Sequence, residues 1–276
     1  MSLPRFGPHD DPGPDFAALL RLTGAGGGAG PLGGAPQHPQ APPDIPHGTT
    51  CVAVRYDSGV VLAGDRRATA GHLISNHRIE KVFPADRHSG VAIAGAAGPS
   101  TEMVRLFQLQ LEHYEKVEGT PISLEGKANQ LGQMVRANLP AAMQGLVVVP
   151  IFAGFDTAAS RGRIFEYDVT GGRYEERDHA ATGSGSLHAD TVVKLAFRPS
   201  MARTAAVDLV LDALYVASDA DAATAGPDPV RDVFPVVAVI DAAGYVRLDD
   251  AELRRRTERL LRRHRSRREG DQGSKS

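Results

Sequence analysis

The chain lacks several features that mark common classes of protein. Its 276 residues include one cysteine, which excludes a framework of intramolecular disulfides and fits a reducing compartment. The formal net charge is only −2, so no global positive field indicates a nucleic-acid partner. No apolar run approaches the roughly 20 residues that a membrane-spanning helix needs. The remaining expectation is a globular protein outside the membrane.

Residues 1–48 differ in composition from the rest of the chain. They hold ten of the 19 prolines and ten of the 30 glycines, which predicts a segment without a fold of its own. Residues 28–33 match the dinucleotide-binding pattern GxGxxG, but no strand precedes them and prolines follow where a helix should begin. The apolar residues 16–22 are too few for a secretory signal, and acidic residues and prolines precede them. We interpret residues 1–48 as a propeptide that is removed on maturation.

The junction after this segment contains the first element of a nucleophilic site. A threonine hydroxyl is a weak nucleophile, but its own free α-amine can accept the hydroxyl proton and activate it. Cutting the Gly48–Thr49 bond would expose such an amine. The sequence therefore predicts Gly48 and Thr49 as the cleavage site, and Thr49 as the catalytic nucleophile.

Two charged residues follow Thr49 at distances that strand hairpins can close. Asp65 lies 16 positions later (65 − 49) and Lys81 lies 32 positions later (81 − 49). Paired strands over 50–56 and 60–64 would return Asp65 to the start of the first strand, and a further strand pair would return Lys81. The lysine cation would lower the pKa of the amine, and the carboxylate would hold the lysine. By spacing alone, such a triple can also be coincidence.

The rest of the chain alternates strands with pairs of helices. Strands are expected over 73–75, 82–83, 90–95, 147–155, 163–169, 174–177, 233–241 and 245–248. Helices are expected over 100–117 with Ser100 as N-cap, and over 123–138, 187–197, 201–217 and 252–265. This order suits two antiparallel sheets packed face to face with helices outside, although pattern alone gives only the α+β class.

A cysteine could act as a nucleophile and histidines could bind a metal, but the sequence pattern supports neither role. Cys51 is a conceivable nucleophile, but it lies in an apolar run and is expected to be a buried small hydrophobe. Five histidines of the body show neither an HExxH motif nor a His-x-His pair with a nearby carboxylate, so we expect no metal and no cofactor.

The C-terminal segment carries the strongest local charge. Ten of the 31 lysines and arginines follow Leu253. A nucleic-acid-binding tail is one interpretation, but no aromatic residues stand between the arginines to stack on bases. We favour a helix with a solvated basic face and with Leu253, Leu260 and Leu261 inward, followed by a disordered tail over 266–276.

The motifs taken together resemble a proteasome β subunit of the actinobacterial type, within the N-terminal-nucleophile hydrolases. They are residues 47–50 (HGTT), 64–69 (GDRRAT), Lys81, 94–98 (AGAAG), 183–186 (GSGS) and 221–226 (DAATAG). Each is weak alone, but their order and spacing form a specific set that covers about residues 49 to 263. The resemblance implies a four-layer αββα sandwich and one β-subunit peptidase domain over 49–265.

The resemblance also assigns roles to residues outside the first hairpin. Gly95 matches the glycine whose backbone N–H stabilises the oxyanion, although an ordinary turn glycine is the alternative. Ser184 matches the serine that hydrogen-bonds the threonine amine, and Asp221 and Thr224 match the residues that complete this network. The family often has serine where Thr224 stands and glycine where Ala225 stands, so the alignment is least secure in that loop.

Substrate contacts follow from the same resemblance. Thr69 and Ala97 match the backbone partners of a peptide that binds as an added strand. Ala68, Ile79, Ile93 and Ala97 match the residues that line the primary specificity pocket. Because these side chains are uncharged and mostly small, we expect apolar P1 residues, although the sequence alone favours core packing for Ile79 and Ile93.

As a whole, the resemblance implies a threonine endopeptidase that forms a cytoplasmic α7β7β7α7 barrel with proteasome α subunits and other β subunits. An ATPase unfoldase would supply unfolded polypeptides marked by a small protein tag, and neither nucleic acid nor membrane would be a partner. A simpler two-ring bacterial peptidase and an acylase-type amidohydrolase are the enzymatic alternatives. A catalytically silent structural subunit is the alternative outside enzymes, and the presence of Thr49, Asp65 and Lys81 together disfavours it.

Overall fold

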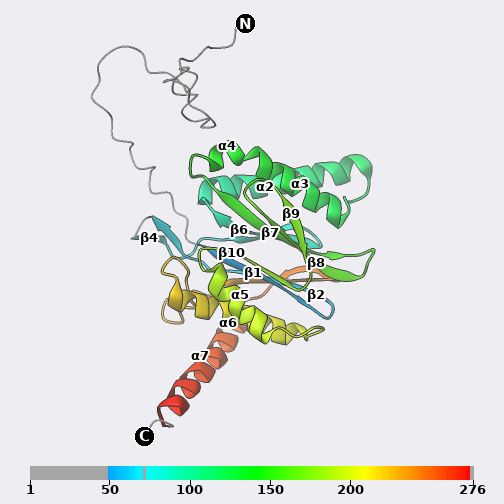
Figure 1. Ribbon diagram of the computed structural model, residues 1–276. Coiled ribbons are helices and arrows are strands. Elements are labelled where there is room, and N and C mark those ends of the chain that lie inside the picture. Colours follow the sequence, from blue (N-terminus) through cyan, green and yellow to red (C-terminus); the bar gives the residue numbers. More distant parts are fainter. Residues whose placement is uncertain (1–48, 71–72, 274–276) are drawn as a thin grey trace, which may run out of the picture. The chain divides into compact units, whose positions relative to one another are not determined.

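The computed structural model describes residues 49–70 and 73–273, so the predicted propeptide over 1–48 lies outside the described residues. Within these residues the strands form two five-stranded antiparallel sheets and one two-stranded hairpin (Figure 1). The first sheet has the order β10-β1-β2-β11-β12, and the second has the order β5-β6-β7-β8-β9. The hairpin pairs β3 with β4.

The strand bounds agree with most of the expected positions. The first sheet contains β1 (Thr50–Tyr56), β2 (Gly59–Gly64), β10 (His179–Gly183), β11 (Val236–Asp241) and β12 (Gly244–Arg247). The second contains β5 (Val82–Asp86), β6 (Ser89–Gly95), β7 (Val148–Asp156), β8 (Arg161–Tyr167) and β9 (Arg173–Glu176). The hairpin consists of β3 (Ala68–Ala70) and β4 (Leu73–Asn76).

Helices cover the outer face of each sheet and complete the predicted four-layer αββα sandwich (Figure 1). The helices are α2 (Ala97–Glu118), α3 (Leu124–Ala137), α4 (Leu139–Ala142), α5 (Ser186–Ala196), α6 (Arg203–Ala220) and α7 (Asp250–Gly273). α2 and α3 pack on the second sheet, whereas α5 and α6 pack on the first. None of the helices in the described part of the chain has the length and hydrophobicity needed to cross a membrane.

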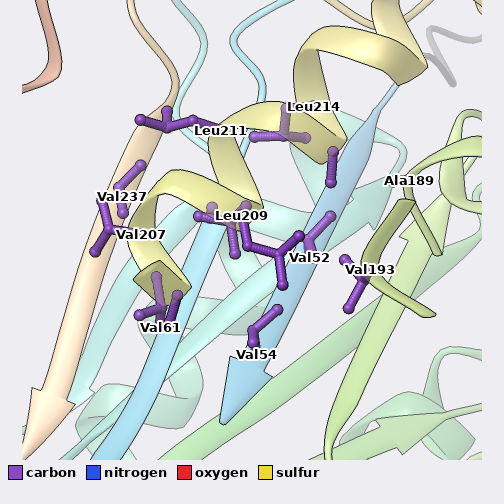
Figure 2. Packing of buried hydrophobic residues seen from close by; sticks show 14 of the residues in the cluster. Val52, Val54, Val61, Ala189, Val193, Val207, Leu209, Leu211, Leu214 and Val237 are labelled. Carbon is purple, nitrogen blue, oxygen red and sulfur yellow. The ribbon is translucent and has the colours of Figure 1, made fainter. Parts of the chain in front are cut away.

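Strand alternation explains why three separate apolar layers form. Successive side chains of a strand point to opposite faces. In β1, Val52 and Val54 belong to the layer beneath α5 and α6, whereas Cys51 and Ala53 belong to the layer between the sheets. Figure 2 shows the first of these layers, where side chains of β1, β2 and β11 meet those of α6 and α5. A third layer lies between the second sheet and α2 and α3.

Several elements differ from the sequence-based expectation. β10 is missing from the prediction, because an alanine-rich stretch of five residues has weak strand propensity and forms a strand only by pairing with β1. α2 begins at Ala97 with Ala96 as N-cap, so the expected N-cap Ser100 is wrong. Pro99 is tolerated there because N–H groups of a first helical turn have no helical partner.

The C-terminal helix is also longer than expected. α7 continues to Gly273, eight residues past the predicted end at 265, so the prediction of a disordered tail is wrong for residues 266–273. Residues 274–276 lie outside the described range. No proline interrupts this segment, and a glycine inside a helix costs only about 1 kcal/mol relative to alanine. Leu253 and Leu260 are buried as predicted, and Leu261 is half-buried.

Ser123 is the N-cap of α3, as the pattern predicts. Its hydroxyl accepts a hydrogen bond from the Gly126 N–H at 3.1 Å. Ser123→Ala is expected to lower the free energy of unfolding by about 1 kcal/mol, because one N–H of the first turn loses its acceptor. Urea denaturation followed by circular dichroism measures this change. Ser123→Asp keeps an acceptor and should stay close to wild type; equal loss in both variants would contradict the capping role.

Candidate active site

The first hairpin brings Asp65 to the start of β1. β1 and β2 pair so that Cys51 lies opposite Gly64. One residue further out, the Thr50 N–H donates to Asp65 Oδ1 at 2.8 Å, and the Asp65 N–H donates to the Thr50 carbonyl at 3.1 Å. The predicted return of Asp65 to the neighbourhood of Thr49 is therefore correct.

Lys81 reaches the same place from the second sheet. Its backbone carbonyl accepts the Ile93 N–H at 2.8 Å, which aligns the residue with β6. Its Nζ lies 2.6 Å from Asp65 Oδ1, and the two side chains are only 4% and 0% exposed. Asp65 Oδ2 accepts two further hydrogen bonds, from the N–H groups of Arg67 and Ala225, both at 2.9 Å. A buried ion pair needs such additional bonds to offset the loss of hydration.

A pocket connects this ion pair with Thr49. The predicted site residues that line it are Thr49, Lys81, Gly95, Ala68, Ile79, Ile93 and Ala97. Thr69 is not among them; it lies in β3 and pairs with Ile74 of β4. The sequence reasoning missed four other lining residues, Glu80, Phe83, Ser100 and Thr101. Ser100 stands about one helical turn after Ala97, which is a signal for a position in the pocket, but its place at the start of the expected helix predicts a cap instead.

Gly95 occupies a position that only glycine fits. Its φ is +121°, and a Cβ atom there would lie 2.0 Å from the Val147 carbonyl oxygen. The next residue holds the same carbonyl, since the Ala96 N–H donates to it at 2.8 Å. β6 therefore ends at the pocket with a residue that has no side chain, just before α2 begins.

Ser184, Asp221 and Thr224 form a hydrogen-bonded group on the other side of Thr49. Ser184 Oγ lies 2.6 Å from Asp221 Oδ2 and 3.3 Å from the Thr49 carbonyl oxygen. The Thr224 hydroxyl donates to Asp221 Oδ2 at 2.6 Å. Burial alone would raise the pKa of Asp221, but the hydrogen bonds from Ser184 and Thr224 outweigh it and hold that pKa below its usual value. The structure thus brings all three predicted residues together.

Thr50 joins this group to the first hairpin, a role that the sequence reasoning missed. The Gly185 N–H donates to Thr50 Oγ1 at 3.0 Å, and Thr50 Oγ1 lies 2.5 Å from Thr224 Oγ1. Because Thr224 donates its proton to Asp221, Thr50 must be the donor to Thr224. One chain of hydrogen bonds therefore runs from Gly185 to Asp221. The only sign of this role in the sequence is that a second threonine, Thr50, directly follows Thr49.

Gly183 explains how β10 can pass so close to Thr49. It lies opposite Thr50 in the β1–β10 pairing and has a φ of +100°. A Cβ atom there would lie 2.0 Å from the Thr49 carbonyl oxygen. That carbonyl instead accepts the Ser184 N–H at 2.9 Å. The missed strand is therefore what aligns Ser184 with Thr49.

Cys51 is fully buried between the two sheets, as the sequence predicts. Burial raises the pKa of its thiol to about 12, because no water solvates the thiolate. We expect Ellman's reagent to leave the native protein unlabelled at pH 8 and to label one thiol per chain after denaturation in guanidinium. Rapid labelling of the native protein would contradict this assignment and would return Cys51 to the list of candidate nucleophiles.

The histidines and the basic helix make contacts away from this pocket. His179 lies 3.1 Å from Asp190, and His264 lies 2.6 Å from Asp212 of α6. Arg256 of α7 pairs with Asp208 at 2.7 Å and with Glu252 at 2.8 Å. In residues 49–70 and 73–273, no group of three or more histidine, cysteine, aspartate or glutamate residues is arranged to hold a metal ion.

The stacked sheets and helices, together with a threonine immediately before the first strand, define the class of the protein. Two antiparallel sheets lie face to face with helices on both outer sides, which is the sandwich of the N-terminal-nucleophile hydrolases. The family model described as "Proteasome subunit" matches residues 45–230. The chain therefore belongs to the proteasome subunit family.

Curated relatives named "Proteasome subunit beta" agree with this assignment. The protein of Acidimicrobium ferrooxidans is 59% identical over 257 residues, which cover 92% of this chain and 91% of the relative. That of Jonesia denitrificans is 54% identical and covers 80% of this chain and 74% of the relative. That of Acidothermus cellulolyticus is 58% identical and covers 76% and 73%.

Proposed function

We propose that this chain is a threonine-type endopeptidase β subunit of a proteasome core particle, with Thr49 as its N-terminal nucleophile. The observation that carries the proposal is the buried pair of Lys81 and Asp65, of which Lys81 lines one pocket together with Thr49 and Gly95. A buried lysine beside a threonine has a clear chemical use, because its positive charge lowers the pKa of a neighbouring amine. The relatives named "Proteasome subunit beta" support the same proposal.

The proposed reaction follows the usual course of acyl transfer. The free α-amine of Thr49 takes the proton of its own hydroxyl, and the hydroxyl oxygen attacks the peptide carbonyl. The Gly95 N–H stabilises the negative oxygen that develops. The protonated amine then gives its proton to the leaving amine, so that an ester links the peptide to Thr49. Water, activated by the same amine, hydrolyses the ester and restores the hydroxyl.

The hydrogen-bonded group around Asp221 has a positioning role in this proposal. Ser184 and Thr224 both donate toward Asp221 Oδ2, and Thr50 extends the group to the residue next to the nucleophile. Ser184 Oγ lies 3.3 Å from the Thr49 carbonyl oxygen. After cleavage the new ammonium or amine group would find these oxygens close by, and they would orient it toward the hydroxyl.

The pocket supports an apolar P1 residue. Ala68, Ile79, Ile93 and Ala97 supply uncharged walls. Glu80 also lines the pocket, but it is paired with Arg247 at 2.8 Å and with Arg66 at 3.5 Å, so its charge is compensated. The peptide would add as a strand, with Thr69 and Ala97 as backbone partners.

Maturation by cleavage of the Gly48–Thr49 bond is part of the proposal. The experiment is an intact mass of the protein purified from its assembled particle. A mass that fits residues 49–276 supports the exposed threonine amine. A full-length mass in an assembled and active particle would remove the proposed base and contradict the mechanism.

The proposed setting is a cytoplasmic α7β7β7α7 barrel in which proteasome α subunits and other β subunits enclose the active sites. Unfolded polypeptides, delivered by an ATPase ring and marked by a small protein tag, would be the substrates. A silent structural subunit is the second candidate. It would need no buried lysine beside Thr49, so the Lys81–Asp65 pair favours the peptidase.

A further inference from the structure

Thr50 places a hydroxyl group on a strand face whose other residues are apolar. Because side chains alternate along a strand, Thr50 lies on the same face of β1 as Val52 and Val54, which pack beneath α5 and α6. Thr50 is 0% exposed. A buried hydroxyl is unfavourable unless its hydrogen bonds are satisfied, and valine would fill a similar space without this requirement. The hydroxyl therefore calls for a reason beyond packing.

The hydrogen bonds of this hydroxyl lead to the carboxylate of Asp221. Thr50 Oγ1 accepts the Gly185 N–H at 3.0 Å and donates to Thr224 Oγ1 at 2.5 Å. The Thr224 hydroxyl donates in turn to Asp221 Oδ2 at 2.6 Å. A hydroxyl has one proton, so the bond from Thr50 leaves the proton of Thr224 to Asp221. Thr50 thereby fixes the direction in which Thr224 faces the carboxylate.

Gly185 leaves the space that these side chains occupy. A Cβ atom at this position would lie 2.5 Å from Thr50 Oγ1, 2.7 Å from Thr224 Oγ1 and 3.2 Å from Asp221 Oδ2. Any other residue would displace the two hydroxyls. The glycine that precedes α5 is therefore part of the same arrangement, and the close packing leaves Thr224 little freedom to move while Thr50 is in place.

The backbone of Thr50 is bonded to the ion pair on the other side of Thr49. Its N–H donates to Asp65 Oδ1 at 2.8 Å, and its carbonyl accepts the Asp65 N–H at 3.1 Å. Asp65 is the partner of Lys81. Thr50 does not line the pocket that contains Thr49, so it has no surface to offer a substrate there. Its one residue thus links the ion pair to the Asp221 group without reaching the pocket.

We propose that Thr50 is a positioning residue whose hydroxyl holds Asp221, and with it Ser184, in place beside Thr49. The inference rests on the proposed function, because it assumes that the Thr49 α-amine is the base that Ser184 and Asp221 orient. Acyl transfer depends steeply on the geometry of the reacting groups. Loss of the Thr50 hydroxyl should therefore slow the chemical step and leave substrate binding unchanged.

The test is Thr50→Val in the assembled particle, assayed with a fluorogenic peptide and normalised to the mature chains counted by intact mass. We expect kcat to fall by about three- to tenfold, the effect of one neutral hydrogen bond, and KM to change by less than about twofold. A wild-type kcat would overturn the proposal, and so would a loss of kcat/KM that lies in KM alone.

Thr50→Ser separates the hydroxyl from the rest of the side chain. It keeps the donor and acceptor and lacks only the methyl group, so it should retain at least about half of the wild-type kcat. A loss as large as that of Thr50→Val would assign the effect to packing of the methyl group and would refute the role of the hydroxyl.

A double-mutant cycle tests whether Thr50 acts through Thr224. In a Thr224→Val background the Thr50 hydroxyl has already lost the partner through which it reaches Asp221. Adding Thr50→Val should therefore lower kcat by less than about twofold further, since mutations in one hydrogen-bonded network are not additive. The full three- to tenfold loss in that background, about the same as in the wild type, would contradict the proposed chain.

Thr257→Val is the matched control. Thr257 of α7 is also 0% exposed, but its hydroxyl has no hydrogen-bond partner among the residues that the structure describes. Replacing it with valine should leave kcat and KM unchanged. An equal fall of kcat in Thr257→Val and Thr50→Val would show that any buried threonine has this effect, and the specific role of Thr50 would be lost.

Thr50→Ala repeats the test if Thr50→Val does not assemble, because it removes the hydroxyl with a smaller side chain and should show the same fall in kcat. If neither variant assembles, the hydroxyl is structural and the proposal is wrong. Failure of the proposed function is a different result. Hydrolysis that survives Thr49→Ala would reject Thr49 as nucleophile, whereas Thr49-dependent hydrolysis with a wild-type kcat in Thr50→Val would reject only this inference.

Discussion

Replacing Thr49 with alanine is expected to abolish peptide hydrolysis, with kcat reduced by at least about 10⁴-fold, as for other enzymes that lose their nucleophile. The hydroxyl oxygen forms the proposed ester, and the other buried groups around it cannot take over this step. Asp65 and Lys81 are bonded to each other, and burial holds the Cys51 thiol protonated. Hydrolysis of a fluorogenic peptide by the assembled particle, with active-site concentration taken from protein mass, measures the effect.

Two further variants sharpen this test. Thr49→Ser keeps a hydroxyl and an α-amine after cleavage and should retain measurable hydrolysis. Thr191→Ala removes a threonine hydroxyl from the exposed face of α5, where it donates to the Leu187 carbonyl, and should behave as wild type. Thr49→Ala should also keep residues 1–48 attached if the chain cleaves itself. Hydrolysis by Thr49→Ala at a tenth of the wild-type rate or more would refute Thr49 as the nucleophile.

Lys81→Met is expected to abolish peptide hydrolysis and to lower the free energy of unfolding. It leaves the Asp65 carboxylate buried without its cation, which costs about 3–5 kcal/mol in comparable pairs. Asp65 retains the hydrogen bonds from Thr50, Arg67 and Ala225, so the fold survives with a reduced free energy of unfolding. Urea denaturation measures the stability, and the same peptide assay measures the activity.

A surface lysine provides the control for this variant. Lys116→Met breaks an exposed pair with Glu112 and should leave the free energy of unfolding nearly unchanged, because solvent screens this pair. The double variant Lys81→Met/Asp65→Asn removes both charges and should be more stable than Lys81→Met alone, since no unpaired charge stays buried. Activity should stay lost in the double variant, because the amine still lacks its neighbouring cation. Full activity in Lys81→Met would contradict the proposed role of the lysine.

The regular elements were largely predictable because their apolar residues have a clear period. β1, β2, β6 and β7 are buried on both faces and appear in the sequence as nearly continuous apolar runs. α3 was located by its cap and its apolar face. β10 was not predictable, because its alanines carry little local preference and its conformation depends on pairing with β1.

The sequence predicted the candidate site better on the side of the first hairpin than on the side of Ser184 and Asp221. On the hairpin side, the short loop between β1 and β2 makes the meeting of Thr49 and Asp65 a local matter of strand register. On the other side, Ser184 and Asp221 were assigned by resemblance alone, because nothing local connects residues 135 and 172 positions away from Thr49 (184 − 49 and 221 − 49). Their meeting requires β10 to pair with β1 and the loop after α6 to reach Asp65 through Ala225.

The sequence by itself determined the class of the protein, and it predicted the cleavage site, the nucleophile and its two charged companions, because these predictions depend on residue type and on short-range strand geometry. Only the tertiary structure decided which groups surround them. It joined Thr50 to Thr224, required glycine at positions 95 and 183, and buried the Ser100 hydroxyl without a hydrogen-bond partner among the described residues. The physical reason is that burial and hydrogen-bond satisfaction depend on contacts between distant segments, which no local pattern of residues encodes.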